Sequence, residues 1–236
     1  MPRASKTAPA RATAATTATA TTATTAVGPD APRLFLLSPA HVGGLRAKLL
    51  LNPKAPFPLA KEFHAKGLPL STVFTFTSGL YFRGKITYAS HFANARRGDS
   101  VRVITSNAGL VDPSLPVGPA EIAAFGATDI DPLDPAYFRP LRRHARALAR
   151  KLGDQGNAIL LGSIATPKYR DVLLDVFGPR LLFPRDFVGR GDMSRGALLL
   201  RSTQANQELP YARVIDAVLT GRRATRVRDV LPVHER

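Results

Sequence analysis

The chain has 236 residues and carries 33 lysines and arginines against 17 aspartates and glutamates, a formal net charge of +16 at pH 7. This length is enough for one sizeable domain. The sequence contains no cysteine. That excludes disulfides, thiolate metal sites, iron–sulfur clusters and cysteine nucleophiles, and it is typical of the cytoplasmic protein that we expect. No apolar run approaches the roughly 20 residues that a membrane span needs, so we expect a soluble protein with no membrane partner.

The positive charge indicates an anionic partner. A field of this sign attracts polyanions at long range, and nucleic acids are the commonest of these. We therefore predict binding of nucleic acid, DNA in preference to RNA, or of a phosphorylated small molecule. The alternative is an arginine-rich composition in which the charge serves solubility alone.

The first 32 residues contain almost only Ala, Thr and Pro, together with three basic residues. Such a segment lacks the large apolar side chains that offset the entropy of ordering. We expect a disordered tail over 1–32, one domain over 33–221 and a basic extension over 222–236. A transit peptide is the alternative for the tail because the segment is poor in acidic residues, although it has no apolar helical stripe.

From residue 33 onward, short apolar runs alternate with helical patterns. The apolar runs predict strands over 33–38, 72–77, 101–106, 157–163 and 197–201. The 3.6-residue patterns predict helices over 58–67, 79–93, 135–153, 167–178 and 208–221. The helix at 135–153 has an arginine-covered outer surface formed by Arg142, Arg143, Arg146 and Arg150. This alternation favours a single three-layer α/β domain with a largely parallel sheet.

Small polar residues follow four of the predicted strands: Ser38 with Pro39, Ser78 with Gly79, Ser106 with Asn107 and Gly109, and Gly162 with Ser163 and Thr166. In open parallel sheets the ligand crevice lies outside the carboxyl ends of the strands. Hydroxyl and amide groups there meet a polar ligand, so the pattern predicts a crevice. Ordinary turn and cap chemistry is the alternative, because the same residue types begin helices and form turns.

Gly79, four residues and then Gly84-Lys85 have the spacing of a phosphate-binding P-loop. A P-loop needs small residues between the glycines and a Ser or Thr after the lysine to hold magnesium. Here bulky residues fill residues 80–83 and Ile86 occupies the magnesium-ligand position. We therefore reject a P-loop, and the sequence leaves the identity of any cofactor unknown.

A helix over 79–93, capped by Ser78, accounts better for the same residues. It places Tyr81, Lys85, Tyr88 and Phe92 on one face. Lys85 would then lie among aromatic rings near a strand end, close to a ligand. The alternative for the two tyrosines is core packing.

Four quoted segments resemble the YaaA peroxide-stress proteins: "LLSPA" (36–40), "FTFTSGLYFRGKITYA" (74–89), "VITSNAGLVDP" (103–113) and "LLGSIATPKY" (160–169). The chain is also similar to a related uncharacterised bacterial family in which "SGLYFRGK", "LLGSIAT" and "FVGRGDMSRG" recur. The YaaA resemblance implies an α/β fold and DNA binding, with functional interest on Ser38, Gly79, Tyr81, Gly84 and Gly109. It departs from the family pattern at His41, where the family has Lys, and at Ala108, where it has Tyr.

Two further segments are candidate phosphate sites. In "HVGGLRAKLLL", Gly43 and Gly44 place backbone amides before the cation of Arg46; a flexible turn is the alternative. In "FVGRGDMSRG" we expect an adaptable glycine loop in which Arg190 and Arg195 form bidentate phosphate contacts.

Three functions stay open from the sequence. The first is a nucleic-acid-binding protein of YaaA-like type with phosphate contacts through basic loops. The second is an enzyme that excises or modifies a base, acting on a nucleotide or nucleobase in the crevice, and the third is a non-catalytic partner-binding protein. For the enzyme, the candidate catalytic residues are His41, Lys85, Asn107 and Asp192. Asp192 either orients an arginine or acts as a general base. The candidate ligand or phosphate contacts are Ser38, Gly43, Gly44, Arg46, Ser78, Gly79, Tyr81, Gly84, Gly109, Gly162, Ser163, Arg190 and Arg195. The histidines show no metal-ligand spacing, so no metal site is predicted.

Overall fold

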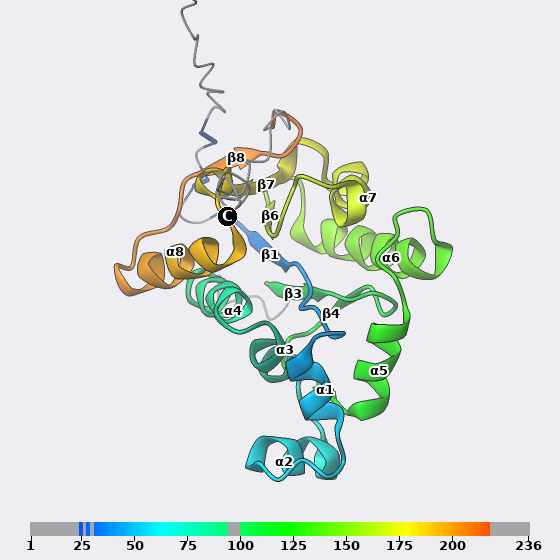
Figure 1. Cartoon of the computed structure of the whole chain (residues 1–236). Coiled ribbons are helices and arrows are strands. Elements are labelled where there is room, and N and C mark those ends of the chain that lie inside the picture. Colours follow the sequence, from blue (N-terminus) through cyan, green and yellow to red (C-terminus); the bar gives the residue numbers. More distant parts are fainter. Residues whose placement is uncertain (1–23, 26, 29–30, 94–99, 218–236) are drawn as a thin grey trace, which may run out of the picture.

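A computed structural model describes residues 24–25, 27–28, 31–93 and 100–217. At its centre is a six-stranded sheet of order β4-β3-β1-β6-β7-β8 (Figure 1). The strands are β1 (Arg33–Leu37), β3 (Val101–Ile104), β4 (Leu110–Val111), β6 (Asn157–Leu161), β7 (Leu181–Pro184) and β8 (Tyr211–Arg213). The four inner strands are parallel, and β4 and β8 pair antiparallel at the edges. The predicted α/β class with a largely parallel sheet is confirmed.

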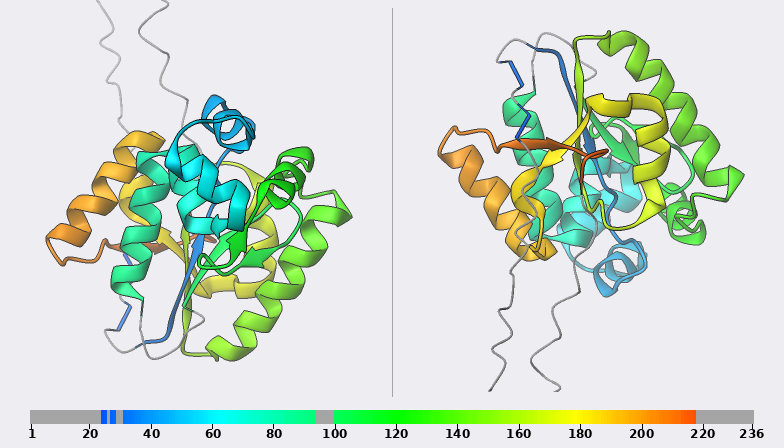
Figure 2. Two further views of the ribbon diagram at one scale, coloured as in Figure 1. Left: turned by 90° about the horizontal axis from the view of Figure 1, so that it is seen from below. Right: turned by 90° about the horizontal axis from the view of Figure 1, so that it is seen from above.

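Helices cover both faces of the sheet (Figure 2). They are α1 (Leu45–Leu51), α2 (Pro58–Lys66), α3 (Leu70–Ser78), α4 (Leu80–Phe92), α5 (Pro119–Ala127), α6 (Pro135–Leu152), α7 (Pro167–Phe177) and α8 (Asp192–Gln204). Two short 3₁₀ turns, Gly178–Arg180 and Arg185–Phe187, flank β7, and β2 (Leu68–Pro69) pairs with β5 (Pro116–Val117) in a small separate ladder. The central strands are buried on both sides, which explains their nearly continuous apolar sequence.

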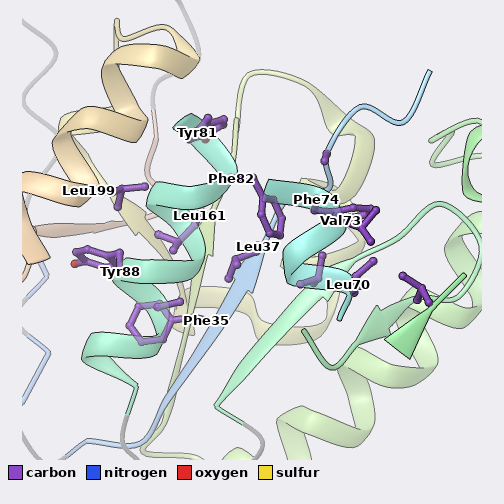
Figure 3. Close-up of a cluster of buried hydrophobic side chains, with 14 of the residues drawn as sticks. Phe35, Leu37, Leu70, Val73, Phe74, Tyr81, Phe82, Tyr88, Leu161 and Leu199 are labelled. Atoms are coloured by element: carbon purple, nitrogen blue, oxygen red, sulfur yellow. The ribbon is translucent and has the colours of Figure 1, made fainter. Parts of the chain in front are cut away.

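Alternate residues of β1 enter two different cores. Phe35 and Leu37 pack with α3, α4 and α8 in one core, whereas Leu34 and Leu36 pack with α6 and α7 in the other. Figure 3 shows the first core, where strand side chains meet aromatic rings from α3 and α4. The rings of Phe74 (α3) and Phe82 (α4) meet edge to face at 5.3 Å, so the two consecutive helices interlock above the sheet.

Two predicted strands are wrong. Residues 72–77 lie in α3 and residues 197–201 lie in α8. In α3 the buried residues are Leu70, Val73 and Phe74, a helical spacing. Short apolar runs are ambiguous between a buried strand and a buried helix, and packing above the sheet decides for the helix here. Ser78 is consequently the last residue of α3, and Gly79, not Ser78, is the N-cap of α4.

The predicted helix at 208–221 is also wrong, because Tyr211–Arg213 form β8 against β7. The chain joins the fold before residue 33 as well: the Thr25 N–H donates to the Tyr211 carbonyl at 2.8 Å in an isolated β-bridge. The expected tail over 1–32 therefore has a folded contact within it. Its first 23 residues and the basic extension at 222–236 lie outside the described residues.

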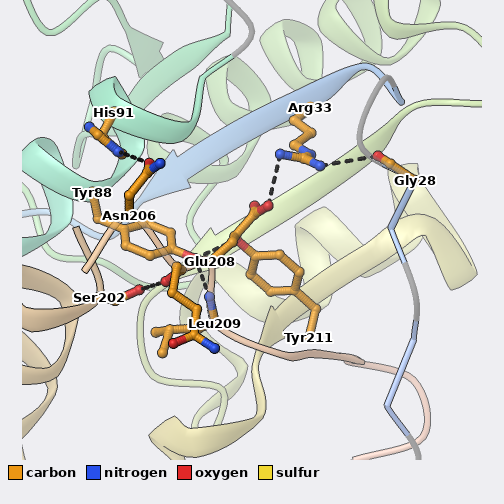
Figure 4. A network of polar contacts seen from close by, with 10 residues as sticks. Gly28, Arg33, Tyr88, His91, Ser202, Asn206, Glu208, Leu209 and Tyr211 are labelled. Atoms are coloured by element: carbon orange, nitrogen blue, oxygen red, sulfur yellow. Dashed lines mark hydrogen bonds and ion pairs between the residues drawn. The ribbon is translucent and has the colours of Figure 1, made fainter. Parts of the chain in front are cut away.

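A polar network holds β8 to α4 (Figure 4). The Tyr88 and Tyr211 hydroxyls lie 2.7 Å apart, and the Leu209 N–H donates to the Tyr88 hydroxyl at 2.9 Å. Tyr211 donates to Glu208 at 2.6 Å, and Glu208 forms an ion pair with Arg33 at 2.8 Å. Burial raises the pKa of both tyrosines above the usual range, so both stay protonated and available as donors.

Candidate functional site

A cavity of about 800 Å³ lies at the carboxyl ends of β1, β3 and β6. The loop after β1 contributes Ser38 to Gly43, and the end of β3 contributes Thr105 and Ser106. The loop after β6 contributes Ser163 and Thr166, and the segment after α5 contributes Thr128, Asp129 and Ile130. The remaining walls come from helices α3, α4, α5, α7 and α8, through Phe74, Ser78, Tyr81, Phe125, Gly126, Lys168, Tyr169 and Asp192. The predicted fourth strand end, at Ser78 and Gly79, is a helix junction, but Ser78 still lies on the wall.

Lys85 lies directly beneath this cavity. Its Nζ donates to the Ser38 carbonyl at 2.5 Å and to Ser38 Oγ at 2.8 Å, and the side chain is only 1% exposed. The ammonium also lies 4.5 Å from the Tyr81 ring centre and 4.9 Å from that of Phe82. The predicted position of Lys85, among aromatic rings at a strand end, is confirmed.

Burial sets the electrostatics of Lys85. Desolvation disfavours the charged ammonium and lowers its pKa from 10.5 to about 7, while the Asp192 carboxylate acts in the opposite direction. Within the described residues, neither a hydrogen bond nor an ion pair joins Lys85 to a carboxylate. Near neutral pH a substantial fraction of Lys85 is therefore an uncharged amine, which is able to accept a proton.

Glycines bring Lys85 to this place. Gly79 has a φ of +64° at the junction of α3 and α4, a backbone conformation that side chains disfavour. At Gly84 a Cβ would lie 2.6 Å from the Gly196 carbonyl oxygen, so α4 and α8 cross in direct backbone contact. The spacing that resembles a P-loop thus arises from a helix junction and a helix crossing, and neither Gly79 nor Gly84 lies on the cavity wall.

Two buried tyrosines lie on the cavity wall. Tyr81 is 7% exposed, and burial raises its pKa; the neighbouring Arg195 guanidinium partly counteracts this rise. Within the described part of the chain, its hydroxyl makes no hydrogen bond of acceptable geometry. Tyr169 accepts a hydrogen bond from the Ser163 N–H at 3.1 Å. A Cβ at Gly162 would lie 2.8 Å from Ser38 Cβ and 3.0 Å from the Tyr169 hydroxyl, so the absence of a side chain there lets Tyr169 approach Ser38.

The segment predicted as a glycine loop begins a helix instead. Asp192 is the first residue of α8, and Arg195 points inward, donating from Nε and Nη2 to the Phe187 carbonyl at 3.2 and 3.1 Å. Asp192 lies 3.7 Å from Arg195, and its side chain is 71% exposed at the cavity mouth. Arg190 donates to the Asp186 carbonyl at 2.8 Å and lies away from the cavity wall.

The structure thus brings together only some of the predicted site residues. Ser38, His41, Gly43, Ser78, Tyr81, Ser163 and Asp192 line the cavity, with Lys85 and Gly162 directly behind Ser38. The cavity lining does not include Gly44, Arg46, Gly79, Gly84, Asn107, Gly109, Arg190 or Arg195.

Several of these excluded residues have structural contacts. Gly109, at φ +69°, lies against Pro140 and His144 of α6 in the β3–β4 turn. Arg46 donates to the Phe76 carbonyl at 3.4 Å, and Asn107 reaches Thr128 Oγ1 at 3.4 Å.

Sequence reasoning missed Tyr169, Lys168 and the whole α5 wall. Tyr169 and Lys168 fall in the first turn of a predicted helix that follows a predicted strand. Because such a helix starts at the carboxyl edge of the sheet, this topology was sufficient to place both residues at the crevice. Helix α5 was missed because its small residues, "PAEIAAFGA", give little periodic contrast.

A positively charged surface lies on α6, and none of its residues lines the cavity. Arg139, Arg142, Arg143, Arg146 and Arg150 line a hollow of about 480 Å³ together with Phe138. Asp175 of α7 is 3.5 Å from Arg142 and 3.9 Å from Arg146. One carboxylate therefore partly neutralises this row of five guanidinium groups, which we call the α6 arginine row.

Among the described residues, no group of three or more His, Asp or Glu side chains is arranged to hold a metal ion. The helices in the same ranges are also too short or too polar to cross a membrane. Comparisons with protein-family models, with curated proteins and with solved structures found no match to the chain. The resemblance to YaaA proteins stays a prediction.

Proposed function

We propose that the chain is a cytoplasmic enzyme that acts on a nucleotide or nucleobase in the cavity at the strand ends. The observation that carries the proposal is the buried Lys85 hydrogen-bonded to Ser38 beneath that cavity. Burying an ammonium without a paired carboxylate is costly, and such groups concentrate at functional sites. A lysine whose pKa is about 7 exchanges protons readily at neutral pH.

The walls of the cavity support this ligand class. Phe74, Phe125 and Tyr81 offer aromatic surface to a planar heterocycle. Lys168 lies in the first turn of α7, where a positive side chain and unpaired helix amides favour a phosphate. Hydroxyl groups from the three strand ends supply donors and acceptors for a sugar or a base edge.

The test is ligand binding and turnover with the full chain. We would titrate nucleobases, nucleosides, nucleoside monophosphates and inorganic phosphate by calorimetry and analyse the same mixtures for products by mass spectrometry. We expect a base-containing ligand to bind, with conversion lost in Lys85→Met and retained in the control Lys61→Met, whose side chain is exposed on α2. Binding of phosphate alone, or equal conversion by both variants, would contradict the proposal.

Nucleic-acid binding through the α6 arginine row is a second candidate function. Four of its members, Arg139, Arg143, Arg146 and Arg150, are exposed along one helix, and such a row contacts successive phosphates of a backbone. It also gathers five of the chain's 33 lysines and arginines on one helix. If the α6 arginine row binds the backbone of a nucleic acid, the nucleotide in the cavity would be one residue of that nucleic acid.

A salt series with labelled duplex and single-stranded DNA tests the second candidate. Reversing Arg143, Arg146 and Arg150 to Glu should weaken binding and reduce the slope of log affinity against log salt by about 3. Reversing Lys61, Lys66 and Arg83, which are exposed on α2 and α4, is the matched control. Equal losses from both triple variants would show that only total charge matters.

A further inference from the structure

We propose that Ser38 is a catalytic nucleophile and Lys85 its general base, and that the substrate is an ester or amide whose carbonyl carbon reaches the floor of the cavity. This inference deepens the proposed function by supplying a reaction at the same site. It rests on that function only in requiring that the cavity accepts a ligand. The base-containing part of the ligand would occupy the remaining volume.

The geometry of the pair fits proton transfer. Lys85 Nζ lies 2.8 Å from Ser38 Oγ, within the range for a base and the proton it removes. Its second hydrogen bond, to the Ser38 carbonyl at 2.5 Å, fixes the amine on the serine's own backbone. A neutral amine held by that donation keeps its lone pair for the Ser38 hydroxyl proton. A weak nucleophile beside an adjacent base is the arrangement that activates serine.

The elements packed around Lys85 favour the neutral form of the amine. The groups facing this site are the Tyr81 hydroxyl on its own helix, Tyr169 on α7, and Asp192 and Arg195 on α8. Burial dominates and lowers the pKa of Lys85 to about 7, although Asp192 raises it in part. Both tyrosines have pKa values raised by burial, so they remain neutral donors across the working range.

Donors near Ser38 fit a developing oxyanion. The Tyr169 hydroxyl lies against Ser38 across Gly162, and its burial keeps it protonated. The first turn of α7, an 11-residue helix, carries backbone N–H groups that have no partner within the helix, and Thr166, Lys168 and Tyr169 there line the cavity. Tyr81 adds a second buried hydroxyl on the cavity wall, beside the Arg195 guanidinium.

The reaction balances without a further reagent except water. The Ser38 proton passes to Lys85 Nζ as Oγ forms a bond to the carbonyl carbon, whose oxygen takes the negative charge. Collapse of this intermediate breaks the bond to the leaving alcohol or amine, which receives the proton from Lys85. A water molecule then attacks the acyl-serine, with Lys85 again as base, and releases the acid and free Ser38.

The test is covalent labelling with a short-chain alkyl fluorophosphonate. In this reaction Ser38 Oγ forms a bond to phosphorus, fluoride leaves, and Lys85 accepts the proton. We expect peptide mass spectrometry to find the adduct on Ser38, at a rate that rises with pH through about 7. Labelling should be absent in Ser38→Ala, about 100-fold slower in Lys85→Met, and unchanged in Ser71→Ala and Lys61→Met.

The wild-type pH profile keeps the test decisive if Lys85→Met fails to fold, and Lys85→Arg provides a second variant that keeps the charge but not the base. An adduct elsewhere, no adduct, or a rate independent of pH between 6 and 9 would overturn the inference. Nucleotide binding without labelling would remove the nucleophile and leave the proposed function intact. Labelling without nucleotide binding would keep the nucleophile and remove the proposed ligand class.

Discussion

The two faces of the sheet carry positive charge in opposite ways. On one face, α4 is buried on several sides, crosses α8 in backbone contact, and holds the single ammonium of Lys85 away from water. On the other face, α6 buries one apolar stripe, including Tyr137, Leu141 and Ala145, and leaves its arginines in solvent.

This difference separates two kinds of chemistry. The buried cation interacts strongly with its few neighbours, because desolvation changes its proton affinity and short hydrogen bonds fix its position. The solvated arginines act together on a polyanion at a range set by salt. We therefore expect substitution of the buried cation on α4 to have a large effect, and single substitutions of the solvated α6 arginines to have small, additive effects.

The largest effect should come from the helix crossing. Gly84→Val places a side chain where a Cβ alone would lie 2.6 Å from the Gly196 carbonyl oxygen, so α4 and α8 must separate. We expect a loss of about 3 kcal/mol in the free energy of unfolding, measured by urea denaturation. Gly126→Ala on α5 is the control, because its Cβ would meet Val42 at an ordinary 3.6 Å. Similar stability of the Gly84→Val variant and the wild type would mean that the crossing is adaptable.

A pH dependence specific to the buried cation should follow. The pKa of Lys85 is about 7 in the folded protein and 10.5 for the free side chain, so between these values the unfolded chain binds one more proton. The free energy of unfolding should therefore gain a positive contribution as pH rises from 7 to 9.5. Urea denaturation at both pH values checks this, and Lys85→Met should lose that contribution. The Arg143→Glu variant of the α6 row should keep it. An equal pH slope in wild type and Lys85→Met would assign the effect to other groups.

Three of the six sheet strands and the position of Lys85 were predictable because they depend on local patterns, whereas β4, β7 and β8 were missed. The sequences of β1, β3 and β6 are largely apolar, and the spacing of Tyr81 and Lys85 placed both on one helical face. Small polar residues after these three strands correctly predicted where a cavity would lie.

The remaining features depended on contacts between distant segments. The run "TVFTFT" contains only β-branched and aromatic residues, which favour strands, so its helical state follows from packing over the sheet and not from propensity. Gly84 and Gly196 are 112 positions apart, and only their meeting shows that both serve a helix crossing and not a phosphate loop. The same holds for Ser38 and Tyr169, which a small residue at Gly162 brings together.

The smallest effect should come from the carboxylate beside the α6 arginine row. Asp175 is 52% exposed and lies 3.5 Å from Arg142 and 3.9 Å from Arg146. Because exposed ion pairs contribute little, Asp175→Asn should change the free energy of unfolding by less than about 0.5 kcal/mol. The substitution removes one negative charge from the row, so we expect DNA affinity to rise about twofold to threefold at low salt and the gain to vanish at high salt. Asp154→Asn, exposed beyond the end of α6, is the matched control. An equal gain in both variants would show that DNA responds to the net charge of the protein and not to the α6 arginine row.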